Sequence, residues 1–194
     1  MKVLHLDSSI TGDASISRTL SAAIVGAFKR DVANIVTYRD LAAEPLHHLE
    51  ATTLGDAPAK AVLAEFLDSD AIVIGAGMYN FSIPSQLKAW IDRILVAGAT
   101  FVYTAEGVQG LAGDKRVIVA LSRGGIYSNG PAAQLEFAEN YLRGVFGFIG
   151  VSNISFVIAE GVAISEEAKE AAVRDALAQA LQVRSGTGLM RPAA

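Results

Sequence analysis

Apolar residues form two kinds of block along the chain. Some blocks are short continuous runs, which are typical of strands buried on both faces, and others repeat every three or four residues, as amphipathic helices do. Largely apolar runs predict strands at residues 2–7, 71–77, 117–122 and 154–160, and the shorter apolar stretch in residues 34–40 is interpreted as a further strand. The periodic runs predict helices over residues 17–30, from Pro58, from Pro84, from Pro131 and after Ser165. Residues 97–114 show neither pattern, and we expect them to be irregular.

Strands that alternate with helices predict an α/β fold with a parallel sheet covered on both faces. We expect a flavodoxin-like three-layer sandwich with a five-stranded parallel sheet in the order 2-1-3-4-5. One domain should span residues 1–182, with residues 183–194 as a flexible tail. In this order the first, third and fourth strands are neighbours, and ligands bind beyond their carboxyl ends. The loops after these three strands are therefore where we look for a site.

The composition of the chain argues against several classes of function. The 194 residues are 52% hydrophobic, enough for one generous core, and the net charge of -4 argues against a nucleic-acid partner. The absence of cysteine excludes a thiol nucleophile, a thiolate metal site and disulfides. No apolar run approaches the roughly 20 residues of a membrane span, so we expect a soluble cytoplasmic protein without a membrane partner. His47 and His48 lack metal-ligand spacing, and we predict no metal site.

The loop after the first predicted strand is rich in hydroxyl groups, with Ser8, Ser9, Thr11, Ser15 and Ser17 before or at the start of a helix. Hydroxyl donors, free backbone N–H groups and the helix dipole together favour an anion such as a phosphate. Simple capping of the helix is the competing interpretation, because Ser and Thr are common caps. The density of hydroxyls favours the phosphate site.

The loop after the third strand, Met-Tyr-Asn-Phe at residues 78–81, is unusually bulky for a turn. Gly75 and Gly77 begin a G-x-G pattern, but Asn80 occupies the third glycine position, so the dinucleotide fingerprint is absent. After the fourth strand, Gly124 and Gly125 allow a backbone to approach a ligand closely. A phosphate pocket beside a flat ring with a polar edge fits FMN better than ATP or NAD.

Several long motifs carry a family resemblance: GMYNFSIPSQLKAWID, AGATFVYTAEGVQGL, SRGGIYSNGP and FGFIGVSNISFVIAEG. With them the chain resembles the FMN-dependent NADH azoreductases, also described as NADH:quinone oxidoreductases, over almost its whole length. The resemblance implies that the FMN phosphate is held by Ser9, Ser15, Ile16 and Ser17. It implies that the isoalloxazine is bordered by Met78, Tyr79, Asn80, Phe81, Ser122, Arg123, Gly124 and Gly125. It implies a substrate pocket lined by Tyr103 and Phe148.

The same resemblance implies a homodimer that binds FMN and uses NADH to reduce quinones and to cleave aromatic azo compounds. Our hypothesis is a ping-pong hydride transfer through the flavin, which needs no catalytic side chain. Two other readings stay open at this point. One is a flavodoxin-type electron carrier that serves protein partners, and the other is a non-catalytic interaction module that binds no flavin.

Overall fold

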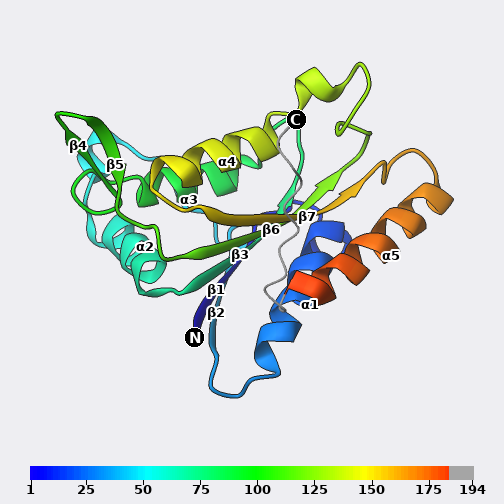
Figure 1. The fold of residues 1–194 in the computed structure, drawn as a ribbon, viewed down its shortest axis with the longest axis horizontal. Helices are drawn as coiled ribbons and strands as arrows, with labels where there is room; N and C mark the ends of the chain where they lie inside the picture. The colour runs from blue at the N-terminus through cyan, green and yellow to red at the C-terminus, as the bar shows by residue number, and fades with distance from the viewer. Residues whose placement is uncertain (184–194) are drawn as a thin grey trace.

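The computed structural model describes residues 1–183, and its centre is a parallel sheet of five strands in the order β2-β1-β3-β6-β7 (Figure 1). The strands are β1 Lys2–Asp7, β2 Ile35–Asp40, β3 Ala71–Gly77, β6 Arg116–Arg123 and β7 Asn153–Glu160. Counted within this sheet, the order is 2-1-3-4-5. The prediction of an α/β fold with this strand order is confirmed.

Helices cover both faces of the sheet (Figure 1). The helices are α1 Ile16–Lys29, α2 Ala57–Asp68, α3 Ser85–Ile94, α4 Ala138–Phe148 and α5 Glu166–Gln182. The short 3-10 turns are η1 Gly12–Ala14, η2 Ala51–Thr53 and η3 Ala133–Leu135. One hydrophobic cluster joins the sheet to α1 and α5, and the other joins it to α2, α3 and α4.

The central strand β3 fixes the position of the loop that follows it. Every residue of β3 is buried, because the strand lies between β1 and β6 and has helices on both faces. Ile72 and Ile74 belong to the cluster that contains Phe66 and Trp90, whose rings meet edge to face at 5.9 Å. Since such a strand has little freedom to move, its carboxyl end at Gly77 presents the next residues in a defined place.

The prediction that residues 97–114 are irregular is wrong. They contain an antiparallel hairpin of β4 Phe101–Thr104 and β5 Gly107–Gly110. Four-residue strands are too short to show a clear alternation in sequence. The base of the hairpin presses on the turn after α4: a Cβ on Gly110 would lie 2.1 Å from the Gly150 nitrogen. The Ala112 N–H also donates to the Ile149 carbonyl at 2.9 Å.

The fourth helix begins later than Pro131, where the sequence predicted it. Residues near Pro131 form only the short η3, and α4 starts at Ala138. The break lies at Glu136, whose backbone is extended and whose carboxylate accepts from the N–H groups of Glu139 and Asn140 at 2.8 and 3.1 Å. This side chain satisfies donors at the start of α4 and so sets its first turn.

Val183 ends α5 as a buried C-cap residue, and the remainder of the expected tail, residues 184–194, lies outside the described residues. Among residues 1–183, no helix combines the length and apolar character that crossing a membrane requires. The same part of the chain has no group of three or more His, Asp or Glu side chains arranged to hold a metal ion.

Candidate functional site

Three loops meet at the carboxyl edge of the sheet, after β1, β3 and β6. The Ser8 N–H donates to the Gly75 carbonyl at 3.1 Å, which joins the first loop to β3. The Met78 N–H donates to the Ser122 carbonyl at 2.8 Å, which joins the second loop to β6. The structure therefore brings together the loops that the sequence singled out.

Hydroxyl groups gather where α1 begins. The Ser15 and Ser17 hydroxyls are 3.1 Å apart, and the Ser9 hydroxyl lies 2.8 Å from the phenol oxygen of Tyr79. Ser15 also caps α1 by accepting from the Arg18 N–H at 3.3 Å, so capping and clustering coexist. In the first turn of α1 the N–H groups of Ile16 and Ser17 have no intrahelical acceptor, and the dipole favours an anion there. This end of the site suits a phosphate group.

The backbone at residues 78–81 is strained. Asn80 and Phe81 have φ values of 47° and 71°, a region that residues other than glycine rarely adopt and that costs about 1–3 kcal/mol each. Reciprocal backbone hydrogen bonds between Tyr79 and Ser82, at 2.9 and 3.1 Å, hold this turn. It leaves Asn80 exposed and Phe81 partly exposed, with the Phe81 ring edge-on to Tyr127 at 6.2 Å. Strain of this kind is concentrated at binding and catalytic sites.

Packing around this turn requires a glycine at position 75 and leaves little room for a side chain at position 77. A Cβ on Gly75 would lie 2.2 Å from the Asp7 carboxylate and 3.0 Å from the Ser21 hydroxyl. A Cβ on Gly77 would lie 3.1 Å from the Tyr79 ring. Their spacing thus follows from contacts with side chains of β1, α1 and the following turn, and needs no dinucleotide.

The side chain of Arg123 is paired with carboxylates, unlike those of the other residues of its loop motif. Its side chain is 1% exposed and turns into a cluster of carboxylates, with Nη2 2.7 Å from Glu139 and 3.1 Å from Glu136, and Nη1 3.5 Å from Glu160. We call these four residues the Arg123 cluster. Ser122, Gly124 and Gly125 stay half-buried at the strand end. The side chain of Arg123 therefore supports the loop from behind.

Glu160, at the end of β7, fixes the loop after β6, and the sequence reasoning missed it. Its carboxylate accepts from the N–H groups of Tyr127 and Ser128, both at 3.1 Å, and from the Ser128 hydroxyl. Burial opposes its ionisation, but the hydrogen bonds from Ser128 and Tyr127 and the charge of Arg123 outweigh burial and lower the pKa of Glu160. The available signal was an acidic residue at the carboxyl end of a predicted strand.

A second arginine cluster lies beside the hydroxyl groups, and the sequence reasoning missed it as well. Arg18 forms a two-pronged ion pair with Asp40, at 2.6 and 2.8 Å, and donates to the Ser9 carbonyl at 3.0 Å. Tyr38 donates to Asp7 at 3.2 Å, and Arg18 Nη1 is 4.0 Å from the same carboxylate. We call Asp7, Arg18, Tyr38 and Asp40 the Arg18 cluster.

Ion pairing and burial act on different members of this cluster. The hydrogen bond from Arg18 is the largest influence on Asp40 and, despite the opposing effect of burial, helps lower the pKa of Asp40 to about 2. Burial, followed by the nearby charges of Asp7 and Asp40, raises the pKa of Tyr38 to about 12. The guanidinium of Arg18 is therefore neutralised by Asp40 at neutral pH, and the anion site beside it relies on hydroxyl and N–H donors.

The rings of Tyr103 and Phe148 both pack against the ring of Phe101, with centroid distances of 5.5 and 4.8 Å. Both residues are exposed, Tyr103 on the hairpin at 70% and Phe148 at the end of α4 at 38%. The start of α4 is joined to the strained turn by the Phe137 N–H, which donates to the Phe81 carbonyl at 3.1 Å. The 11 residues of α4 span roughly 16 Å. Within one chain, the predicted substrate residues thus lie a helix length from the predicted flavin loops.

Comparison with known proteins gives a consistent picture. Residues 1–183 match a family described by its flavodoxin-like fold. An FMN-dependent NADH:quinone oxidoreductase of Stenotrophomonas maltophilia (strain K279a) is 54% identical, over 92% of this chain and 93% of the relative. FMN-dependent NADH:quinone oxidoreductase 1 of Xanthomonas axonopodis pv. citri (strain 306) is 53% identical, over 97% and 100%. The crystal structure of an azoreductase from Bacillus anthracis str. Sterne superposes with a TM-score of 0.88 at 30% identity, covering 94% and 98% of the two chains.

Proposed function

The chain belongs to the FMN-dependent NADH:quinone oxidoreductases of the flavodoxin-like fold family, and on this premise we propose that it is an FMN-dependent oxidoreductase. Its electron donor is NADH, and its acceptors are quinones and aromatic azo compounds. The observation that carries the proposal is the meeting of a hydroxyl-lined helix start with a strained aromatic turn at one sheet edge. When bound, FMN supplies a two-electron carrier between donor and acceptor.

The donor set fits the phosphate of FMN. We assign the phosphate to the hydroxyls of Ser9, Ser15 and Ser17 and to the N–H groups of Ile16 and Ser17. The hydroxyls of Ser15 and Ser17 lie at the start of a 14-residue helix, where the dipole favours negative charge. Tyr79 hydrogen bonds to Ser9 at 2.8 Å and so connects the phosphate end to the ring end of the site.

The ring end of the site is assigned to the turn after β3 and the loop after β6. Met78, Tyr79, Asn80 and Phe81 present side chains and backbone to one border of the flavin. Ser122, Gly124 and Gly125 present backbone to the other border, while Arg123 acts on it only through its cluster. The carbonyls of Gly124 and Gly125 accept from Ala163 and Gly161 at 3.0 Å. Because these carbonyls are engaged, the peptide planes are fixed and the N–H groups of the loop are oriented in advance.

We propose that the active form is a homodimer in the cytoplasm. Tyr103 and Phe148 are a helix length from the flavin loops of their own chain, and beside them Val108 and Leu111 leave apolar surface exposed. A second copy docked on this surface would carry its Tyr103 and Phe148 toward the flavin of the first. The exposed apolar group around the hairpin supports this arrangement, since such patches commonly mark interfaces.

The visible absorption spectrum of the purified protein, recorded after incubation with FMN and removal of free flavin, tests the proposal. We expect a flavin band that bleaches on adding NADH without oxygen and returns on adding menadione. A matched variant, Tyr79→Phe, should retain the band but bind FMN several-fold more weakly, because it loses the hydrogen bond to Ser9.

The other two outcomes of this experiment would each support a different function. A band that bleaches but is not restored by menadione or methyl red would leave a flavodoxin-type electron carrier. A protein that remains colourless with FMN would overturn the site assignment and leave a non-catalytic interaction module.

A further inference from the structure

Arg93, in the last turn of α3, is a buried cation with no ion-pair partner in the part of the chain that the structure describes. Its side chain is 6% exposed, and among residues 1–183 no carboxylate oxygen lies within 4.0 Å of it. Nη1 donates to the Ala89 carbonyl at 2.9 Å, and Nε is buried with no hydrogen-bond partner. Arg18 and Arg123 also leave Nε unpartnered, but each of them contacts carboxylates at 2.6–3.5 Å. Arg93 differs from both because no carboxylate of the described residues lies within ion-pair distance of its guanidinium.

The position of Arg93 in α3 does not account for its burial. A cation in the last turn of a helix gains from the helix dipole, and the contact with Ala89 belongs to that effect. This gain is small beside the cost of removing an arginine from water, which is normally offset by an opposite charge. An anion that reaches the guanidinium would supply the missing compensation.

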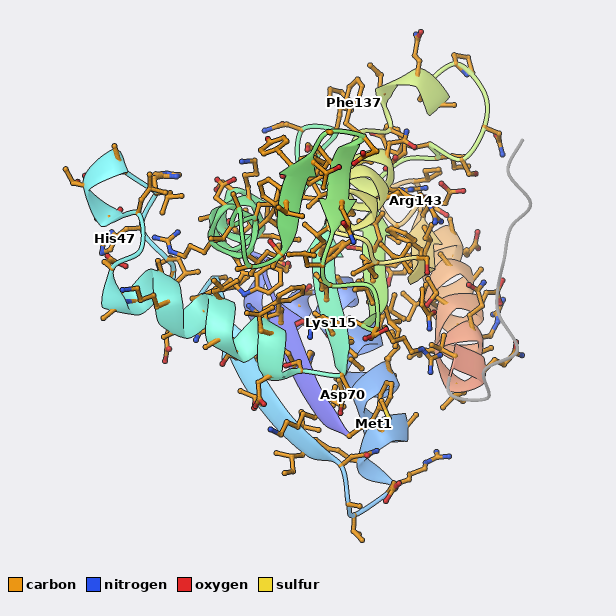
Figure 2. All side chains as sticks on the ribbon, turned by 60° about the vertical axis from the view of Figure 1, so that its left-hand side comes forward. Met1, His47, Asp70, Lys115, Phe137 and Arg143 are labelled. Carbon is orange, nitrogen blue, oxygen red and sulfur yellow. The ribbon has the colours of Figure 1, made fainter. Side chains whose placement is uncertain are left out.

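A pocket of about 340 Å³ leads to Arg93. Pro45, Leu46 and Pro58 form an apolar part of its wall, and His47 and His48 line it as well. Figure 2 shows His47 on the loop before α2, far from Phe137, which marks the loops of the proposed flavin site. Within one chain, the pocket and the flavin loops are therefore separate places.

The acidic residues of this pocket are engaged elsewhere. Asp56 caps α2 by accepting from the Ala59 N–H at 2.8 Å. Glu50 accepts from the Thr52 hydroxyl at 3.4 Å at the start of η2. Their charges disfavour a dianion such as phosphate in the same pocket, but they tolerate a single negative charge held directly by a guanidinium.

We propose that this pocket binds a small organic monocarboxylate with an apolar or aromatic body. The planar guanidinium of Arg93 is shaped to pair with a carboxylate, and the prolines and Leu46 receive the hydrocarbon part. The volume of about 340 Å³ is at the lower end of the range for small-molecule pockets and suits a body of about one ring. The argument for this site uses none of the residues assigned to FMN.

Saturation-transfer NMR on the FMN-incubated protein tests the proposal, with benzoate as the probe. Benzamide is the neutral probe of the same shape, and inorganic phosphate is the dianionic one. We expect saturable benzoate binding at low millimolar or lower concentration and at least tenfold weaker binding of benzamide and phosphate. Arg93→Met should weaken benzoate binding at least tenfold, and Arg174→Met, on the exposed face of α5, should leave it unchanged.

Two further variants keep the test decisive if Arg93→Met does not fold. Arg93→Lys keeps the positive charge but loses the planar guanidinium that can donate to both carboxylate oxygens, and it should weaken benzoate binding several-fold. Pro45→Trp at the exposed wall should block the probe while Arg93 stays in place. Tyr103→Ala should not alter benzoate binding, which separates this pocket from the proposed substrate pocket.

Three results would overturn the proposal. One is equal binding of benzoate and benzamide, and another is benzoate binding that survives both Arg93 variants. The third is absence of saturable binding to the unmodified protein. If Glu50→Gln then created binding, Glu50 would be identified as the solution partner of Arg93, and no external ligand would be required.

Discussion

The two arginine clusters that flank the site use the same residue type in different ways. In the Arg18 cluster, Arg18 pairs with one carboxylate through two hydrogen bonds, and its side chain is 16% exposed. In the Arg123 cluster, one fully buried arginine meets Glu136, Glu139 and Glu160. In the first, Arg18 and Asp40 form a close two-pronged pair beside the phosphate end, and the second carboxylate, Asp7, lies farther away at 4.0 Å. In the second cluster three carboxylates surround one buried guanidinium. Arg143, 2.7 Å from Glu139, adds a second positive charge and so offsets only part of the excess negative charge.

The difference shows how many elements each arginine holds in position beside the site. Arg18 connects β2 to the Ser9 carbonyl, so it acts on one loop. In the Arg123 cluster each carboxylate also binds backbone or side chain elsewhere: Glu136 sets the start of α4, and Glu160 holds residues 127–128. Loss of the central cation there would disturb the helix, the loop and β7 together.

The largest expected effect comes from Arg123→Met. It leaves three carboxylates facing one another with no central cation, and we expect a loss of about 3–5 kcal/mol in the free energy of unfolding. Urea denaturation measures it, and Arg174→Met, in an exposed ion pair, should change the value by less than about 1 kcal/mol. Similar stability of the two variants would contradict the central role of Arg123.

Arg18→Met should have a smaller effect, because Asp40 keeps access to water and still accepts from the N–H groups of Ala42 and Ala43. We expect a loss of about 1–3 kcal/mol in unfolding free energy and weaker FMN binding, since the Ser9 carbonyl loses a donor. Flavin fluorescence titration measures the affinity. Arg30→Met, exposed at the other end of α1, is the matched control and should bind FMN normally. A loss of stability with unchanged affinity would separate the cluster from the phosphate site.

Acid should act on the Arg18 cluster through Asp40. Its pKa is about 2 in the folded protein against 3.8 as the ordinary value, so its stabilising contribution is complete above pH 4 and is lost as the pH falls toward 2. Unfolding free energies measured between pH 4 and pH 2 should fall more steeply in the unmodified protein than in Asp40→Asn. Asp13→Asn, exposed in η1, should keep the steeper fall. Parallel curves for Asp40→Asn and the unmodified protein would contradict the ion pair.

The smallest expected effect is that of Ser128→Ala, which removes one of the donors to Glu160 but keeps the two backbone donors. We expect a loss of about 0.5–1.5 kcal/mol in unfolding free energy and at most a few-fold loss in FMN affinity. Thermal denaturation and the fluorescence titration measure both. A loss as large as that of Arg123→Met would show that the hydroxyl, not the arginine, dominates the cluster.

The sequence predicted the sheet well because buried parallel strands are continuous apolar runs, as in residues 71–77. It also predicted which three loops meet, because strand order alone decides which carboxyl ends are neighbours. The hairpin at Phe101–Gly110 escaped prediction because each of its strands has only four residues. The late start of α4 was not predicted, because the spacing of apolar residues does not reveal the contact between the Glu136 carboxylate and the Glu139 N–H, which sets the first turn of the helix.

The supporting residues of the site were harder to predict than those that face it. Ser15 and Asn80 are conspicuous by residue type and position in a loop. Arg18, Arg123 and Glu160 are ordinary charged residues in sequence, and their partners lie 13–37 positions away. Only the fold brings such pairs together. Arg123 illustrates the limit most clearly: its motif predicted a place at the flavin, but not that its side chain pairs with three carboxylates.

The contact between Gly110 and Gly150 limits how this protein can diverge. A methyl group on Gly110 would collide with backbone atoms of residues 149 and 150, and Gly150 has a φ of 93° with its own Cβ position 3.1 Å from Gly110 backbone. No flexible side chain is available to move aside, so neither position can gain a side chain alone. When segments are exchanged between relatives, the hairpin and the turn after α4 must therefore be taken from the same protein. Insertions at the exposed hairpin tip, residues 105–106, do not affect the contact between Gly110 and Gly150.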